Sequence, residues 1–169
     1  MNFFCDANRY NSIFKEKAGK KPKISNMWLA TWRDEEGYTR HDLLYDATTN
    51  NQTEYGSMLF VLRHIYKQRI NQVLGINPWL EEVVIHGDSQ LMIYQMLGKY
   101  QVKDGDLKPL WLEAINLVIN LKHMGVEVRF VWIPRELNNE ALGITSKILP
   151  PPDTLGDLLE ALGDSNAQG

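Results

Sequence analysis

The order of the predicted elements indicates an α/β fold, in which a five-stranded mixed sheet is flanked by helices. Residues 1–45 carry short apolar or alternating runs that are typical of strands, whereas from residue 51 onward apolar residues recur at the three- and four-residue spacing of helices. Two further short apolar runs follow, and each is preceded by a helical pattern. We therefore expect three antiparallel strands and then two strands reached by helical crossovers, in the order βββαβααβα.

The first three strands are predicted from runs that polar turns separate. Residues 2–7 form a short apolar run containing Asp6, and residues 27–32 alternate with a period of two. The turn signal Asp34-Glu35-Glu36-Gly37 ends the second run, and residues 38–45 follow as its pairing strand.

The next two helices and the fourth strand follow from changes in period. The first helix carries an apolar stripe, and its members are Tyr55, Met58, Leu59, Leu62, Ile65 and Tyr66. Asn51, with Glu54 three residues later, gives this helix a predicted start. Residues 81–86 form a buried strand, and Gly87-Asp88-Ser89 then opens a helix that stops at Gly98.

The C-terminal elements complete the pattern. After a polar connector, residues 110–121 are helical and Gly125 stands at the expected stop position. Residues 126–133 alternate as a fifth strand, and a last core helix is predicted over Asn138–Leu149. Pro150-Pro151-Pro152 ends that helix, because proline cannot continue it.

The length and composition suit one compact domain. The chain has 169 residues, of which 44% are hydrophobic, so it can bury a sizeable core but leaves little room for a second domain. We assign residues 1–149 to the domain and residues 150–169 to a proline hinge and a short, acidic amphipathic helix. That helix either packs on its own domain or docks to a protein partner.

Two absences limit the classes of protein that fit. The single cysteine, Cys5, excludes an intramolecular disulfide and a zinc site built on several thiolates, so we expect a cytoplasmic protein. No run of eighteen apolar residues occurs, so no membrane association is expected. The sequence does not define an oligomeric state. The basic segment Arg9–Lys23 is interpreted either as a phosphate-contacting loop or as a solvated hairpin tip.

Three carboxylates lie where this topology would gather them: Asp6 in the first strand, Glu54 in the first helix and Asp88 after the fourth strand. Converging carboxylate oxygens without a cluster of His or Cys suit Mg²⁺ better than zinc. Each helical acid has an alternative role, since Glu54 could cap the helix through Asn51 and Asp88 could be a helix N-cap. Asp6 has no helix to cap, and its burial would cost free energy.

Four strings in this order resemble the successive motifs of the ribonuclease H family, in particular its reverse-transcriptase-like branch. They are Asp6-Ala7-Asn8, Thr49-Asn50-Asn51-Gln52-Thr53-Glu54, His86-Gly87-Asp88-Ser89-Gln90 and Ile133-Pro134-Arg135-Glu136-Leu137-Asn138-Asn139-Glu140-Ala141. The resemblance extends over about residues 1–149. It implies the ribonuclease H-like fold and a metal-dependent endonuclease that hydrolyses the RNA strand of RNA–DNA hybrids.

The resemblance also implies roles for individual residues. Asp6, Glu54 and Asp88 match the family's first three acids, which act as catalytic residues and ligands of Mg²⁺, with Mn²⁺ as a substitute ion. The matching polar residues near the minor groove of the hybrid, where 2′-hydroxyls distinguish RNA from DNA, are Asn8, Asn50, Asn51 and Gln90. For Asn8 and Asn50, turn formation is an equal alternative.

The chain departs from the family at the last motif. The family continues Ala-Asp, but Ala141 is followed here by Leu142, which offers no ligand atom. Asn138, Thr145 and Ser146 share the helical face of Leu142 and could supply neutral oxygens. The alternative function is therefore a catalytically impaired ribonuclease H-like module that binds nucleic acid. A third possibility is a protein-interaction domain that works through its C-terminal leucines.

Overall fold

A computed structural model of the protein describes residues 1–9, 28–44, 49–73 and 81–143. The strands are β1 (Asn2–Arg9), β2 (Trp28–Asp34), β3 (Thr39–Leu44), β4 (Glu82–Gly87) and β5 (Glu127–Trp132). The helices are α2 (Asn50–Val73), α3 (Gln90–Met96), α4 (Lys108–His123) and α5 (Arg135–Leu142). The order of these elements along the chain is the predicted βββαβααβα.

The five strands form one mixed sheet in the order β3-β2-β1-β4-β5. The pairs β1–β2 and β2–β3 are antiparallel, whereas β1–β4 and β4–β5 are parallel. This confirms the predicted topology of three antiparallel strands followed by two crossover strands. Strand β1 lies at the centre, where Asp6 is opposite Thr31 of β2 and Phe4 is opposite His86 of β4.

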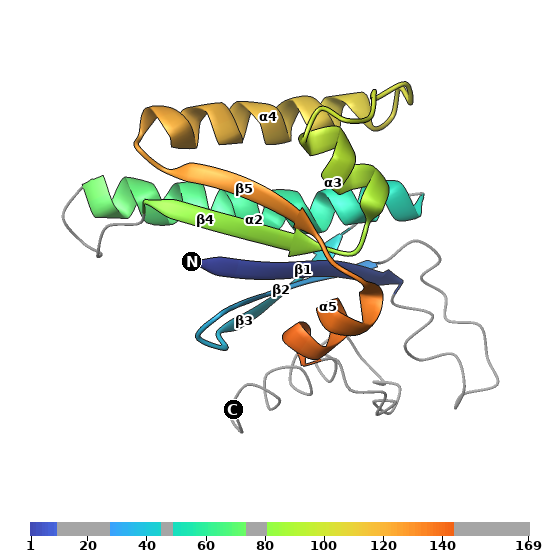
Figure 1. The fold of residues 1–169 in the computed structure, drawn as a ribbon, viewed down its shortest axis with the longest axis horizontal. Coiled ribbons are helices and arrows are strands. Elements are labelled where there is room, and N and C mark those ends of the chain that lie inside the picture. The colour runs from blue at the N-terminus through green and yellow to red at the C-terminus, as the bar shows by residue number, and fades with distance from the viewer. Residues whose placement is uncertain (10–27, 45–48, 74–80, 144–169) are drawn as a thin grey trace.

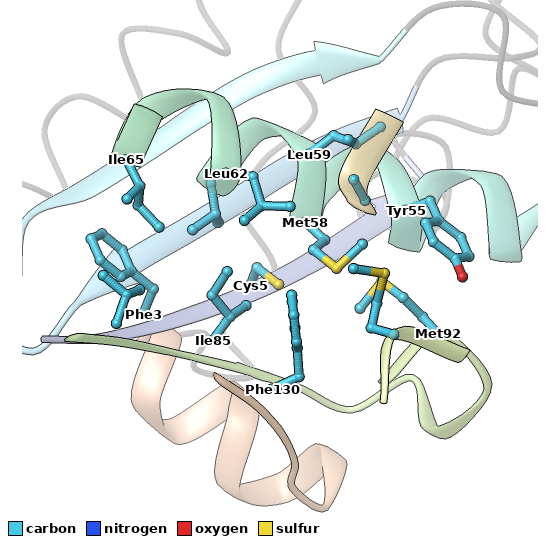
Figure 2. Packing of buried hydrophobic residues seen from close by; sticks show 14 of the residues in the cluster. Phe3, Cys5, Tyr55, Met58, Leu59, Leu62, Ile65, Ile85, Met92 and Phe130 are labelled. Atoms are coloured by element: carbon cyan, nitrogen blue, oxygen red, sulfur yellow. The ribbon is translucent and has the colours of Figure 1, made fainter. Parts of the chain in front are cut away.

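Helices cover both faces of the sheet: α2, α3 and α4 lie on one side and α5 lies on the other (Figure 1). The predicted apolar stripe of α2 packs into the core, and Met58, Leu62 and Ile65 are fully buried. Figure 2 shows Phe3 and Cys5 of β1 in this core layer beneath α2. Because side chains alternate along a strand, Asp6, which follows Cys5, points toward the opposite face, which carries α5.

The last helix differs from the prediction over Asn138–Leu149. It begins three residues earlier, at Arg135. Pro134, with an extended ψ of 150°, is the N-cap, so the helical residues start directly after it. It ends at Leu142, where Gly143 adopts a left-handed φ of 69° and supplies the C-cap. The sequence pattern therefore placed the start of the helix too late and missed the stop at Gly143.

Several predictions fall outside the described residues. They include the loop assignment for residues 10–23 of the basic segment, the proposed neutral oxygens of Thr145 and Ser146, and the hinge and helix over residues 150–169. Docking of that helix to a protein partner stays a prediction. None of the helices in the described ranges has the length and apolar content that crossing a bilayer requires.

Candidate metal centre

Three elements that are distant in sequence bring three carboxylates together. Asp6 lies in β1, Glu54 lies in the second turn of α2, and Asp88 directly follows β4. One carboxylate oxygen from each residue lies within 4.8 Å of the oxygens from the other two. Asp6 is only 5% exposed, so this cluster is withdrawn from bulk water at its centre. The structure thus assembles the three acids that the sequence singled out.

Neither helical acid is used as a cap. At the start of α2, the backbone N–H of Gln52 donates to Oγ1 of Thr49 at 3.3 Å, and the backbone N–H of Thr49 donates to Oε1 of Gln52 at 3.1 Å. This reciprocal pair is a capping box, so the predicted pairing of Asn51 with Glu54 is wrong. The capping role considered for Glu54 is therefore filled by Gln52.

The same replacement occurs at α3. Its N-cap is Ser89, whose side chain accepts a hydrogen bond from the backbone N–H of Met92 at 3.4 Å. Asp88 precedes the cap, and its side chain is only 2% exposed. Since a carboxylate buried without a local backbone role is costly, the position of Asp88 calls for a cationic partner.

The surroundings of Glu54 change its protonation. Burial, together with the negative charges of Asp6 and Asp88, raises the pKa of Glu54 to about 9, although Arg135 acts in the opposite direction. Burial also raises the pKa of the neighbouring Cys5 thiol, with a further contribution from Glu54. Cys5 therefore stays protonated and does not offer a thiolate ligand.

Two residues near the end of β5 contact Asp88. Nε of Arg135 donates to Oδ2 of Asp88 at 3.0 Å, and Nε1 of Trp132 donates to the backbone carbonyl of Asp88 at 3.1 Å. The remaining carboxylate oxygen, Oδ1, is buried and has no hydrogen-bond partner among the described residues. Asp88 is thus fixed on two sides and keeps one desolvated oxygen available.

The α5 side of the site contains no carboxylate from the position after Ala141. Leu142 is 5% exposed and therefore buried, as its apolar side chain favours. Asn138 is fully buried one turn earlier, and its Nδ2 donates to the carbonyl of Cys5 at 2.9 Å. The predicted shared face of Asn138 and Leu142 is confirmed. Oδ1 of Asn138 has no hydrogen-bond partner within the described residues.

The polar residues assigned to nucleic acid by the resemblance lie close to the acids in sequence. Asn50 and Asn51 are exposed at the first turn of α2, and Gln90 is exposed at the first residue of α3. Asn8 lies in β1, two residues beyond Asp6. Their exposure leaves Asn50, Asn51 and Gln90 accessible to a ligand.

Sequence reasoning missed Arg135 and Trp132 as neighbours of the cluster. The sequence places Arg135 only within a motif and Trp132 only within the predicted fifth strand. One signal was present: β5 was predicted to lie in the same sheet as the strand ending before Asp88, so residues at its end were candidates to meet that acid. The register pairs Trp132 with Gly87, the residue before Asp88, so the end of β5 lies beside that acid.

The donor set fits a hard divalent cation. It consists of three carboxylates. Asp88 has a buried oxygen without a partner among the described residues, and Glu54 has a raised pKa, and both features indicate negative charge that lacks compensation. Carboxylate oxygens are preferred by Mg²⁺, Mn²⁺ and Ca²⁺, whereas zinc sites favour imidazole and thiolate.

The strand order, the helices on both faces and the acids beside the central strand together define the ribonuclease H fold. No family model matches the sequence. Ribonuclease H1 from the halophilic archaeon Halobacterium salinarum NRC-1 superposes with a TM-score of 0.55 at 20% identity, covering 83% of this chain and 89% of that one.

Two further solved structures give the same result. LC11-RNase H1, solved in complex with an RNA/DNA hybrid, has a TM-score of 0.56 at 24% identity and covers 83% of this chain and 89% of that one. The N-terminal RNase H domain of rv2228c from Mycobacterium tuberculosis, solved as a fusion with maltose binding protein, has a TM-score of 0.54 at 20% identity, with 83% and 91% covered. The chain therefore has the fold of these ribonucleases H. The reverse-transcriptase-like branch stays a prediction.

Proposed function

We propose that this protein is a ribonuclease H, a divalent-cation-dependent endonuclease that hydrolyses the RNA strand of RNA–DNA hybrids. The observation that carries the proposal is the convergence of Asp6, Glu54 and Asp88, whose oxygens lie within 4.8 Å of one another on a ribonuclease H fold. We place the protein in the cytoplasm because its one cysteine is a free, buried thiol.

The proposed substrate is supported by a neighbour and by the exposed amides of Asn50, Asn51 and Gln90. LC11-RNase H1, which shares the fold, was solved with an RNA/DNA hybrid. In this chain Asn8, Asn50, Asn51 and Gln90 are assigned to the minor groove, where amide groups can donate to and accept from 2′-hydroxyls. An interaction with the 2′-hydroxyl would distinguish the RNA strand from DNA.

The proposed chemistry assigns a role to each acid. Asp6, Glu54 and Asp88 would hold Mg²⁺, or Mn²⁺ in its place. When bound, such an ion lowers the pKa of a coordinated water and stabilises negative charge on a phosphate. Arg135 orients Asp88 by binding Oδ2, and Trp132 fixes the backbone of the same residue. Glu54 carries a proton at neutral pH until a cation displaces it.

The proposal is tested with a labelled RNA–DNA hybrid, the purified chain and Mg²⁺ or Mn²⁺. We expect cleavage of the RNA strand only, with the Asp6→Asn variant at least about a hundredfold slower because it loses a charged ligand. The matched control is Asp106→Asn, which makes the same change at an exposed loop position outside the cluster. Absence of cleavage, or cleavage that Asp6→Asn leaves unchanged, would remove the proposal.

A second candidate function rests on Leu142. A module that retains the fold and binds hybrids without hydrolysis is favoured by the burial of a leucine where the family has its fourth acid. It requires that wild-type protein bind the hybrid with no turnover and that Asp6→Asn bind equally well. For the nuclease, the Leu142→Asp variant is expected to raise the rate, because it adds a carboxylate on the α5 side.

A further inference from the structure

The charge balance of the cluster differs from that of an isolated group of acids. Asp6, Glu54 and Asp88 contribute three negative charges when ionised, and Arg135 contributes one positive charge through its 3.0 Å contact with Asp88. With Glu54 deprotonated, as it must be to act as a ligand, the net charge of these four groups is two negative charges. One divalent cation neutralises that charge completely, whereas two cations would leave an uncompensated double positive charge in a largely buried site.

The number of ligand atoms in the cluster also favours a single cation. Oδ2 of Asp88 accepts a hydrogen bond from Arg135, whose positive charge disfavours a cation there, so the buried, unpartnered Oδ1 is the better ligand atom. No fourth Asp, Glu, His or Cys of the described residues lies within the same 4.8 Å of the three acids. Three carboxylates can surround one ion together with water molecules, because Mg²⁺ retains several waters in protein sites.

Among the residues up to 143 that the structure describes, the α5 side provides no second set of charged ligands. Leu142 is buried and apolar, and the amide of Asn138 is anchored on the carbonyl of Cys5. The charged side chain that α5 does send to the site is Arg135, which repels a cation. Because α5 contributes a positively charged arginine and an apolar leucine, it disfavours binding of a second metal ion.

We infer that this cluster binds one divalent cation at a time and that Arg135 takes the place of a second cation beside Asp88. The inference rests on the cation site of the proposed function but not on nucleic-acid cleavage. It identifies Arg135 as a positioning residue, which limits the occupancy of the site through Asp88, and it gives the reason why a leucine is compatible with position 142.

The test is a titration of the full chain with Mn²⁺, without nucleic acid, in which free Mn²⁺ is followed by electron paramagnetic resonance. We expect one Mn²⁺ per chain in the wild type and in the Asp106→Asn control. Two Mn²⁺ of comparable affinity would overturn the inference while leaving the proposed function intact. Absence of specific binding would overturn both.

Two variants test whether Arg135 and Leu142 limit the cluster to one cation. Leu142→Asp is expected to bind a second Mn²⁺ because it adds an acid on the α5 side, and circular dichroism verifies that it folds. Arg135→Gln changes a side chain that is 73% exposed but removes the positive charge beside the buried Asp88, so circular dichroism verifies its folding as well. We expect Arg135→Gln to bind Mn²⁺ roughly tenfold more tightly, because a repelling charge is removed and Oδ2 of Asp88 is released. Weaker binding by Arg135→Gln, or one Mn²⁺ per folded Leu142→Asp chain, would contradict the assignment.

Discussion

Nε of Arg135 lies 3.0 Å from Oδ2 of Asp88, so the guanidinium group of an exposed helical residue neutralises part of a buried acidic cluster. This contact raises the pKa of Arg135 further above its ordinary value, which keeps the guanidinium charged at every pH at which the protein is folded. The acids of the cluster are therefore never without a positive neighbour. That neighbour does not suffice to ionise all three, since Glu54 retains a raised pKa.

Cation affinity is predicted to depend on pH through Glu54. Its pKa of about 9 means that the side chain is protonated at neutral pH, so a cation must displace one proton to use it as a ligand. Between pH 6 and pH 8.5 the affinity for Mg²⁺, measured by calorimetry, should rise by about tenfold per pH unit and then level off near pH 9. Glu54→Gln should bind more weakly and lose this slope. A wild-type affinity that is independent of pH would contradict the assignment of Glu54 as a ligand.

The same ionisation predicts a change in stability without metal. Because folding raises the pKa of Glu54, the protonated side chain stabilises the fold below its ordinary pKa of 4.5, and this contribution is lost as the pH rises toward 9. In urea unfolding with a chelator present, Glu54→Gln should therefore become more stable than the wild type, by a margin that grows from pH 5 to pH 9.

Addition of Mg²⁺ should reverse that order, because the wild type gains binding free energy that the variant largely lacks. The Asp106→Asn chain serves as the control and should follow the wild type under both conditions. If Glu54→Gln were less stable than the wild type at pH 9 with the chelator, the buried acids would not repel one another as described.

Trp132 is predicted to hold Asp88 in place through its indole N–H. Trp132→Phe removes the 3.1 Å hydrogen bond to the backbone carbonyl of Asp88 but keeps an aromatic ring. We expect a loss of about 0.5–1 kcal/mol in the free energy of unfolding, since the bond is partly exposed, together with weaker Mn²⁺ binding. Chemical denaturation and Mn²⁺ titration measure the two effects.

Trp111→Phe is the matched control for this change. Nε1 of Trp111 is buried without a hydrogen-bond partner in the described part of the chain, so the same substitution breaks no such bond there. It should leave Mn²⁺ binding unaltered. Equal effects of the two variants on Mn²⁺ binding would show that Trp132 does not position Asp88.

The start of α2 is predicted to depend on Thr49 and not on Asn51. Thr49→Ala removes the oxygen that accepts from the backbone of Gln52 and should cost about 1 kcal/mol of stability. Asn51→Ala, at an exposed helical position, should change stability by less than about 0.5 kcal/mol. Thermal unfolding of the two variants decides between the caps, and the reverse ranking would restore Asn51 as the capping residue.

Most of the sheet could be predicted from the sequence because burial on one or two faces leaves a period in the chain. The alternation before Asp34 and the apolar run of β4 located two strands, and the stripe on α2 located the core. The convergence of the acids followed from topology, since parallel neighbours of a central strand bring their ends together. These features depend on patterns that extend over many residues.

Features set by a single contact could not be predicted in this way. The early start of α5 depends on the backbone angle of Pro134, and its end depends on the left-handed Gly143. Thr49 is one of several residues before α2 that could act as a cap, and only the geometry selects it. Likewise, the pairing of Arg135 with Asp88 joins residues 47 positions apart, which no local spacing reveals.

The claim on which the proposal rests is that Asp6, Glu54 and Asp88 jointly hold a divalent cation. Crystals of the protein soaked in Mn²⁺ test it directly, because anomalous scattering distinguishes manganese from water and from the light atoms of the protein. We predict one strong anomalous peak in contact with oxygens of all three carboxylates. An empty cluster at saturating Mn²⁺, or a peak that contacts fewer than two of these side chains, would contradict the account.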